Sequence, residues 1–421
     1  MLLIIFARLN GGLTMNIREL RNMFPALSRT VYGKQLVYFD NAATAQRSQS
    51  VIDKWTQLTI GANANIHRAV HKLAVDATDE YESTRDAVKE YINAAAREEI
   101  VFTSGTTGSI NLVAFSFGET FVNKGDEIIV SESEHHSNIV PWQMLCQRKG
   151  AVLRVLHVDE DGHLNLDELK SLLNPKTRIV AVTQISNVLG ILNPVKEIVS
   201  VCHSVGCPVL IDGAQGMVHE GVDVQDVDCD FYAFSGHKLY AATGTGVLYG
   251  KCKWLDQMVP YQGGGEMIAT VRFSGTTYAP LPEKFEAGTQ NINAIPTLEP
   301  AIEMLKLMKD KELLNAQEAV SQYLFHALTS NPRIRLYGVP RGTETKIPLF
   351  SFSVEGAHHE DLALILDKMG IAVRSGQMCA EPLMDRFGVT GMLRASLAPY
   401  NTMDEAEYFI KSLDKAIAML V

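Results

Sequence analysis

Lys238 and Asp212 are the residues whose types and positions point most directly to chemistry. Lys238 follows the apolar run DFYAFSG over residues 230–236, and Asp212 lies near the end of CPVLIDG over residues 207–213. A lysine amine that is removed from water has a lowered pKa and can form a Schiff base with a carbonyl group. A carboxylate that ends an apolar strand needs a partner, either at a helix start or in a protonated ring nitrogen. The alternative for Lys238 is an ordinary surface lysine.

Two further apolar runs end in residues that suit a phosphorylated aromatic ligand. EEIVFTS (98–104) is followed by Thr106 and Thr107, whose hydroxyls and helix-start N–H groups suit a phosphate. The alternative is a Gly/Thr turn that only caps a helix. DEIIVSES (126–133) leads to His135, whose flat ring can stack on an aromatic ring or lie in a surface loop.

The fifth run, RIVAVTQ over residues 178–184, leads to Asn187, whose amide can hydrogen-bond a ring oxygen. In an open α/β sheet ligands bind beyond the carboxyl ends of the strands, so all five polar clusters are expected to meet. Together they supply a phosphate cradle, a stacking ring, a hydrogen bonder, a carboxylate and a Schiff-base amine. This combination matches pyridoxal 5'-phosphate as a cofactor.

The elements that must position these residues form an α/β pattern. The runs are nearly continuous in Val, Ile, Leu and Phe, which is typical of a mostly parallel sheet flanked by helices on both faces. A sixth run lies at 247–251, and helices are expected over 79–94, 165–174 and 194–205. A long helical stretch over 297–330 is followed by IRLYGV, PLFSFSV, a helix near 359–369 and IAVRSGQMCA, which predict a smaller α+β domain.

We therefore expect an N-terminal arm over residues 1–30 packing on the small domain, a cofactor-binding large domain over 31–305, and a small C-terminal α+β domain over 306–421. The first six residues are apolar before Arg8, which is too short for a membrane span and lacks the features of a signal peptide. We interpret residues 1–14 as upstream translation, with Met15 as the functional start of the protein. The alternative is that they form an ordered N-terminal arm.

Composition excludes several classes of protein. A length of 421 residues suffices for two or three domains, and 46% hydrophobic with 20% charged residues excludes disordered and fibrous chains. The net charge of −10 repels a phosphate backbone, so no nucleic-acid partner is expected. Six cysteines without C-x-x-C or zinc-site spacing predict no metal site and a reducing, cytoplasmic location.

Several longer motifs carry a family resemblance. DGAQ, FYAFSGHKLY, SGTTGSIN, EHHSNIVPW and RSGQMCAEPL, followed by LRASLAPYNT, resemble the class V, fold-type I aminotransferase superfamily. Within it the chain is similar to group II (SUF-type) cysteine desulfurases, a branch that includes selenocysteine lyase-like members. The resemblance extends from about Phe24 to the C-terminus. It implies a fold-type I pyridoxal-phosphate enzyme acting as a homodimer.

The resemblance also implies individual roles. Lys238 matches the Schiff-base lysine, Asp212 the partner of the pyridine nitrogen, His135 the stacking residue and Cys379 the catalytic cysteine. For the phosphate, the implied ligands are Thr107, Ser235 and His237, with Thr106 beside them, and Thr289 of the partner subunit. Gln215 and Asn187 are implied to contact the phenolic oxygen and the substrate region. Arg394 is implied to bind the substrate carboxylate, and Arg374 to be a second arginine lining the pocket.

The implied reaction converts L-cysteine to L-alanine. Lys238 removes the α-proton, and the Cys379 thiolate takes the sulfur as a persulfide for a SufE-like acceptor that feeds iron–sulfur cluster assembly. Most cysteines are small core residues, but Cys379 lies in a Gly-rich polar turn between Arg374 and Pro382, a setting that favours a reactive thiolate. The other five cysteines are expected to be structural.

Two departures from the family pattern stand out. Met378 replaces the usual histidine before the cysteine, so a proton-handling role for that histidine does not apply. Ala241-Ala242 replaces the usual Gly-Pro after the lysine, which would be strained if the first position needed a positive φ. The remaining alternatives are a selenocysteine lyase acting on L-selenocysteine, a class V transaminase or hydrolase that does not need Cys379, and a non-enzymatic cofactor-binding scaffold.

Overall fold

The computed structural model describes residues 15–341 and 346–421, so the interpretation of residues 1–14 concerns a segment outside the described part. Its largest element is a seven-stranded sheet in the order β4-β10-β9-β8-β7-β5-β6, in which β10 is antiparallel to both neighbours and the other pairs are parallel. The strands are β4 (Ile100–Thr103), β5 (Glu127–Ser131), β6 (Val152–Leu156), β7 (Thr177–Thr183), β8 (Val209–Asp212), β9 (Phe231–Ser235) and β10 (Gly246–Gly250).

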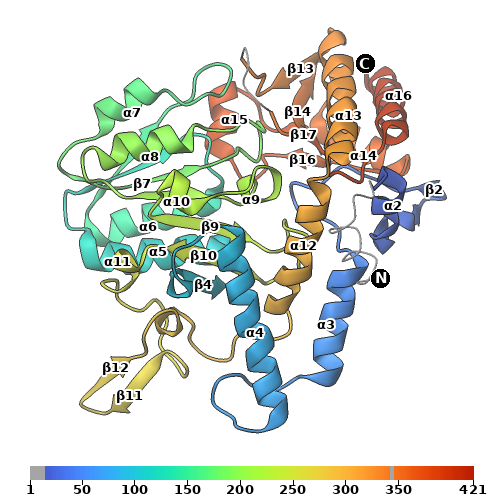
Figure 1. Ribbon diagram of the computed structural model, residues 1–421. Coiled ribbons are helices and arrows are strands. Elements are labelled where there is room, and N and C mark those ends of the chain that lie inside the picture. The colour runs from blue at the N-terminus through green and yellow to red at the C-terminus, as the bar shows by residue number, and fades with distance from the viewer. Residues whose placement is uncertain (1–14, 342–345) are drawn as a thin grey trace.

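Helices cover both faces of this sheet (Figure 1). We predicted an α/β fold with a mostly parallel sheet, and this prediction is confirmed. The helices associated with the sheet are α3 (Gln49–Gly61), α4 (Lys72–Tyr91), α5 (Thr106–Phe121), α6 (Val140–Lys149), α7 (Leu166–Leu172), α8 (Val195–His203), α9 (Gly216–His219), α10 (Val224–Val227), α11 (Cys252–Leu255) and α12 (Leu298–Met308).

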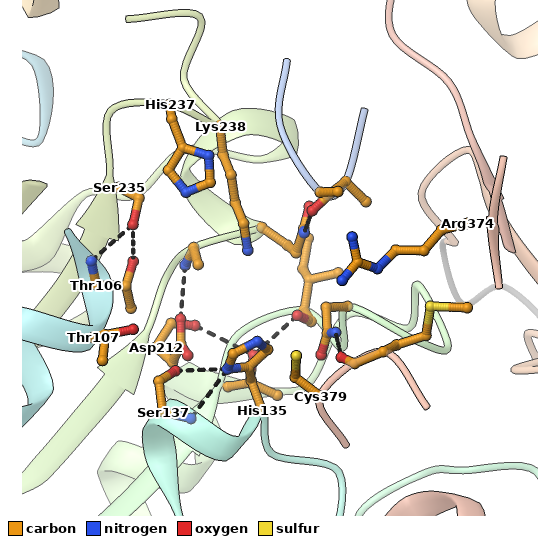
Figure 2. Close-up of a pocket in the computed structure, with 18 of the residues that line it drawn as sticks. Thr106, Thr107, His135, Ser137, Asp212, Ser235, His237, Lys238, Arg374 and Cys379 are labelled. Atoms are coloured by element: carbon orange, nitrogen blue, oxygen red, sulfur yellow. Dashed lines mark hydrogen bonds between the residues drawn. The ribbon is translucent and has the colours of Figure 1, made fainter. Parts of the chain in front are cut away.

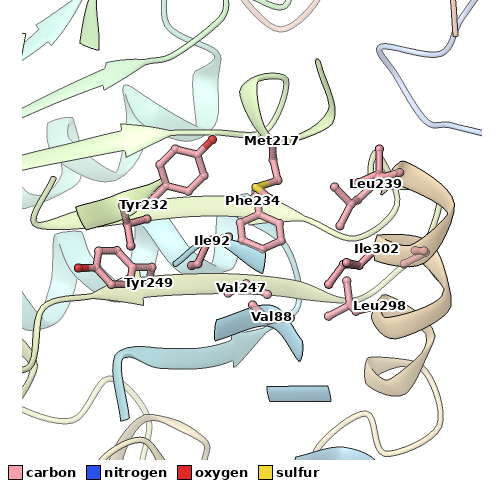
Figure 3. Close-up of a cluster of buried hydrophobic side chains, with 14 of the residues drawn as sticks. Val88, Ile92, Met217, Tyr232, Phe234, Leu239, Val247, Tyr249, Leu298 and Ile302 are labelled. Carbon is pink, nitrogen blue, oxygen red and sulfur yellow. The ribbon is translucent and has the colours of Figure 1, made fainter. Parts of the chain in front are cut away.

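The sheet is buried because successive side chains point into two separate apolar layers. On β9, Tyr232 and Phe234 belong to one hydrophobic cluster, whereas Phe231 and Ala233 belong to the other. Figure 3 shows the first layer, where side chains of β9 and β10 lie next to residues of α4 and α12. Burial on both faces explains why these strands have nearly continuous apolar sequences.

A smaller antiparallel sheet lies beside the large one, in the order β13-β14-β17-β16 (Figure 1). Three helices pack against one of its faces and form a separate hydrophobic cluster. The elements are β13 (Ile334–Tyr337), β14 (Leu349–Val354), β16 (Arg374–Gly376), β17 (Met392–Ser396), α13 (Lys311–Ser330), α14 (His359–Lys368), α15 (Glu381–Phe387) and α16 (Met403–Leu420). The division of the chain at residues 305/306 remains a prediction.

The N-terminal described segment contacts both parts. Arg21, in α2 (Ile17–Asn22), pairs with Glu405 of α16 at 2.8 Å. Phe24 packs against Tyr400 and also against Tyr240, which follows β9. The remaining strands are β1 (Thr30–Val31), β2 (Lys34–Gln35), β3 (Val37–Tyr38), which pairs in parallel with β15 (Ile371–Ala372), and the exposed hairpin β11 (Ile268–Arg272) with β12 (Gly275–Tyr278).

Two expectations about elements need correction. The helical stretch over 297–330 is two helices, because the Asp310 side chain accepts from the N–H groups of Glu312 and Leu313 and caps a new helix. Strand β6 was not predicted, since it is an edge strand with exposed positions and contains Arg154. Within the described residues, no helix is long and apolar enough to cross a membrane.

Candidate active site

One pocket lies between the two sheets, and most of the predicted site residues line it. Figure 2 shows Lys238, Arg374 and Cys379 pointing toward the same central space, with Thr106, Thr107 and Ser235 at one end. The predicted residues that line the pocket are Thr106, Thr107, His135, Asn187, Asp212, Gln215, Ser235, His237, Lys238, Arg374, Cys379 and Arg394.

The large sheet supplies its residues from the carboxyl ends of five strands, as parallel pairing requires. Thr106 begins α5 directly after β4, and its N–H donates to the Ser235 Oγ at the end of β9 at 2.7 Å. The two hydroxyls are also 2.7 Å apart. The start of α5 and these hydroxyls form an anion cradle at this end of the pocket.

Lys238 and Asp212 form the charged centre of the pocket. Burial lowers the pKa of Lys238 to about 8, although the nearby Asp212 carboxylate opposes the shift. Burial raises the pKa of Asp212, and the positive charge of Lys238 and the N–H of Ala214 counteract the rise. Among the described residues, the Asp212 side chain accepts a hydrogen bond only from Ala214 N, at 2.9 Å. The carboxylate therefore retains acceptor capacity for a cationic donor.

The hydrogen bonds of His135 determine which ring nitrogen carries its proton. Its Nδ1 accepts from the backbone N–H of Ser137 at 3.1 Å and lies 2.8 Å from the Ser137 hydroxyl. Because Nδ1 is an acceptor, the proton of the neutral ring belongs on Nε2. Burial, followed by the charge of Lys238, lowers the pKa of His135 to about 4. The ring is therefore neutral at physiological pH.

The opposite wall of the pocket carries two arginines from the small sheet. Arg374 of β16 and Arg394 of β17 are directly opposite each other in the antiparallel register. Arg394 is 2% exposed; its Nη1 donates to Asn187 O at 2.8 Å and its Nη2 to Asp40 Oδ1 at 3.1 Å. Its Nε is buried without a partner within the described structure. An unpaired buried donor beside a second guanidinium suits a carboxylate ligand.

Cys379 is the exposed cysteine of the six, and it lies at the mouth of this pocket. Both Met378 and Cys379 have positive φ angles, 55° and 56°. The Met378 side chain is buried in an apolar cluster with residues such as Leu189 and Leu383. This explains how a methionine fits where relatives were expected to carry histidine.

Three predicted ligands have partners within the protein. Asn187 Nδ2 donates to Met378 O at 2.9 Å, so this amide holds the cysteine segment. Gln215 Nε2 donates to Ala42 O at 2.8 Å. His237 Nδ1 lies 3.3 Å from Thr44 Oγ1, and burial lowers the pKa of the His237 ring to about 4.

Thr289 does not line the pocket of its own chain. It lies instead in a separate cavity with Gly244 and Gln290. The structure contains one chain, so the expected contribution of Thr289 of the partner subunit stays a prediction. Ala241 and Ala242 are both buried, and the positive φ in this turn belongs to Tyr240 (68°) rather than to either alanine.

Several residues in and around the site were missed from the sequence. Asp40 pairs with Arg394 across 354 positions, and Ala42 and Ser137 line the pocket. Glu134 is fully buried behind His135, where it accepts from Asn138 Nδ2 and Thr183 N, and burial raises its pKa to about 8. Its place as the first residue of the EHH motif, shortly after a buried strand, was the available signal. Among the described residues, no group of His, Cys, Asp or Glu is arranged to hold a metal ion.

The two sheets and the pocket between them match the fold-type I aminotransferases, which in general depend on pyridoxal 5'-phosphate. Within this class, the chain belongs to the family "Aminotransferase class-V", whose model matches residues 37–409.

The most informative relatives are named cysteine desulfurases. The chain is 45% identical over 405 residues to the cysteine desulfurase of Pectobacterium carotovorum, covering 96% of this chain and 98% of the relative. It is 44% identical over 402 residues to that of Cronobacter sakazakii, covering 95% and 98%. The solved structure of cysteine desulfurase CsdA from Escherichia coli has a TM-score of 0.89 at 39% identity, covering 97% of this chain and 100% of that chain. These findings confirm the resemblance inferred from the motifs.

Proposed function

We propose that this protein is a cysteine desulfurase, which converts L-cysteine to L-alanine and holds the released sulfur as a persulfide on Cys379. The observation that carries the proposal is the presence of Lys238 and the exposed Cys379 on opposite sides of one pocket, with two arginines beside them. A transaminase would need the lysine and an arginine but not the thiol. The two relatives described above are both named cysteine desulfurases.

The pocket fits pyridoxal 5'-phosphate as the cofactor. Thr106, Thr107, Ser235 and His237 line the end of the pocket at the start of α5, where an anion is favoured. Asp212 keeps an oxygen for the ring nitrogen, and His135 offers a neutral ring to stack on. When bound, the cofactor supplies an aldehyde that condenses with an amine and a ring that stabilises the electron pair left by proton removal.

The chain's own residues then divide the work. The substrate carboxylate pairs with Arg394, whose Nε is the unpartnered donor, and Arg374 adds a second positive charge. Lys238, with its pKa lowered to about 8, has a neutral fraction at pH 7 to 8 and takes the α-proton of the substrate.

Cys379 completes the reaction as a nucleophile. Its thiolate attacks the substrate sulfur, so that an S–S bond forms while the C–S bond breaks and the electron pair stays with the substrate carbon. Protonation of that carbon gives alanine, and the sulfur remains as Cys379–S–SH. One L-cysteine and one thiol thus yield one alanine and one persulfide, without an added oxidant.

The proposal extends to partners and location. The protein is proposed to act as a homodimer in which Thr289 of the partner subunit completes the phosphate site. The exposed position of Cys379 supports onward transfer of sulfur to a SufE-like acceptor for iron–sulfur cluster assembly. Six free cysteines, four of them buried, support a reducing cytoplasm.

The test is a paired measurement of alanine and sulfide released from L-cysteine under reducing conditions. We expect equimolar products from the native protein and neither product from Cys379→Ala, which should retain the cofactor's absorbance. Cys252→Ala is the matched control, since Cys252 is partly exposed but lies outside the pocket. Equal alanine formation by native protein and Cys379→Ala would refute the thiol role, and a strong preference for L-selenocysteine would favour a selenocysteine lyase.

A further inference from the structure

His136 joins the cofactor side of the pocket to the segment that carries Cys379. It begins the short 3₁₀ helix His136–Asn138, directly after His135. Its backbone N–H donates to Cys379 O at 2.8 Å. Its ring Nε2 accepts from the backbone N–H of Glu381 at 3.1 Å, at the start of α15. One residue of the loop that follows β5 therefore contacts the chain on both sides of Ala380.

The cysteine segment needs such contacts because its backbone is strained. Met378 and Cys379 are consecutive residues with side chains in the left-handed region, at φ 55° and 56°. Each costs about 1–2 kcal/mol in this conformation, and such residues persist only where their surroundings hold them. Asn187 supplies another of these contacts through Met378 O at 2.9 Å.

The location of the His136 ring argues for a positioning role rather than a role in global stability. The side chains of His136 and Glu381 are 35% and 57% exposed. A hydrogen bond in such a place adds little to the stability of a protein of this size. It does fix the start of α15, and thereby the backbone that leads out of Cys379.

We propose that His136 is a positioning residue for Cys379: its ring acceptor and its backbone N–H hold the strained 378–381 segment at the distance from His135 and the cofactor that sulfur transfer requires. This proposal rests on the proposed desulfurase function. In this chain the residue before the cysteine is Met378, which packs in the apolar cluster, so the polar contact to the large sheet comes from His136 instead.

The test compares three variants loaded with cofactor. His136→Phe keeps a ring without an acceptor, and His136→Gln restores an acceptor near the position of Nε2. His326→Phe is the matched control on the exposed face of α13. The measurements are the rate of persulfide formation on Cys379 in the first turnover, the cofactor content and absorbance, and hydrogen exchange of the 377–385 peptide.

For His136→Phe we expect persulfide formation to slow about 10- to 100-fold, because small displacements of a nucleophile are costly. Exchange of the 377–385 peptide should become faster, while cofactor content and absorbance stay unchanged. His136→Gln should return to within about twofold of the native rate, and His326→Phe should match the native protein.

Three results would overturn the proposal. The persulfide rate of His136→Phe could be unchanged, His136→Gln could be as slow as His136→Phe, or the His136→Phe and His136→Gln variants could lose cofactor to the same extent. Failure of the proposed function itself is distinguishable, since the native protein would then form no alanine from L-cysteine.

Discussion

Replacing Arg394 with lysine should weaken binding of the substrate carboxylate while leaving the cofactor site intact. Arg394 uses Nη1 for Asn187 O and Nη2 for Asp40, and its buried Nε has no partner. Lysine keeps the positive charge but loses the planar fork that allows two parallel hydrogen bonds. It cannot serve Asp40, the Asn187 carbonyl and a ligand in the same geometry.

The size of the effect follows from the donors that are lost. A charge-assisted hydrogen bond contributes about 1.5–3 kcal/mol, and about 1.4 kcal/mol corresponds to a factor of ten. Loss of the Nε contact alone therefore predicts a fall in kcat/KM of about 10- to 150-fold. The loss should fall mainly on KM, because the carboxylate is held in both the bound substrate and the transition state.

The assay is the rate of alanine formation over a range of L-cysteine concentrations, together with titration of the apoprotein with pyridoxal phosphate. Arg374→Lys is the matched control on the facing strand; its side chain is more exposed, so solvent screens its charge and we expect a smaller effect. A change in KM of less than twofold in Arg394→Lys, or an equal loss of cofactor affinity, would contradict the assignment of Arg394 to the substrate.

Three further predictions concern the lysine, the dimer and a buried ion pair. The rate at which the apoprotein captures pyridoxal phosphate should rise with pH up to about pH 8 and then level off. The reason is that the pKa of Lys238 is lowered to about 8 and the neutral amine is the reactive form. A rate that keeps rising tenfold per pH unit beyond pH 9 would contradict this. Mixing unfolded Lys238→Ala and Thr289→Ala chains and refolding them should restore about a quarter of native activity, since half of the dimers would carry one complete site; no recovery would place Thr289 outside the partner's site. Glu286→Ala should lower the free energy of unfolding in urea by about 3–5 kcal/mol, because it removes the buried carboxylate that pairs with Arg85 at 2.8 Å and also accepts from Tyr81 Oη and Phe102 N, although Arg85 keeps its second partner Glu82. The exposed Glu303→Ala, which breaks the pair with Lys306, should cost less than about 0.5 kcal/mol, and equal losses would refute the argument.

The sequence predicted the sheet and the residues at its strand ends for a physical reason. A strand covered on both faces must be almost entirely apolar, so the first polar residues after β8 and β9 mark the edge where ligands bind. This reasoning located Asp212 and Lys238 without knowledge of the tertiary contacts. It failed for β6, whose outer position lets polar residues such as Arg154 occupy the strand.

The contacts between the two sheets could not be read from local patterns. Asp40 approaches Arg394, and Ser351 Oγ donates to Val188 O, over separations of 354 and 163 residues. No periodicity or turn signal encodes such pairs. Likewise, the sequence could not tell whether Ala241 needs a positive φ; the structure has the positive φ at Tyr240 and buries both alanines.

The two proposed nucleophiles come from different sheets, and this arrangement makes the connections between the sheets part of the chemistry. Lys238 follows β9 of the large sheet, whereas Cys379 follows β16 of the small one. The small sheet is held by loop contacts, such as Asn187 to Met378 O and Arg394 to Asn187 O, and not by pairing with the large sheet's strands. Asn187 therefore touches both the arginine assigned to the substrate and the segment of the cysteine. A shift of this residue would move carboxylate binding and sulfur transfer together. An amide suits this position because its side chain donates to Met378 O, while its backbone carbonyl, which any residue would offer, accepts from Arg394.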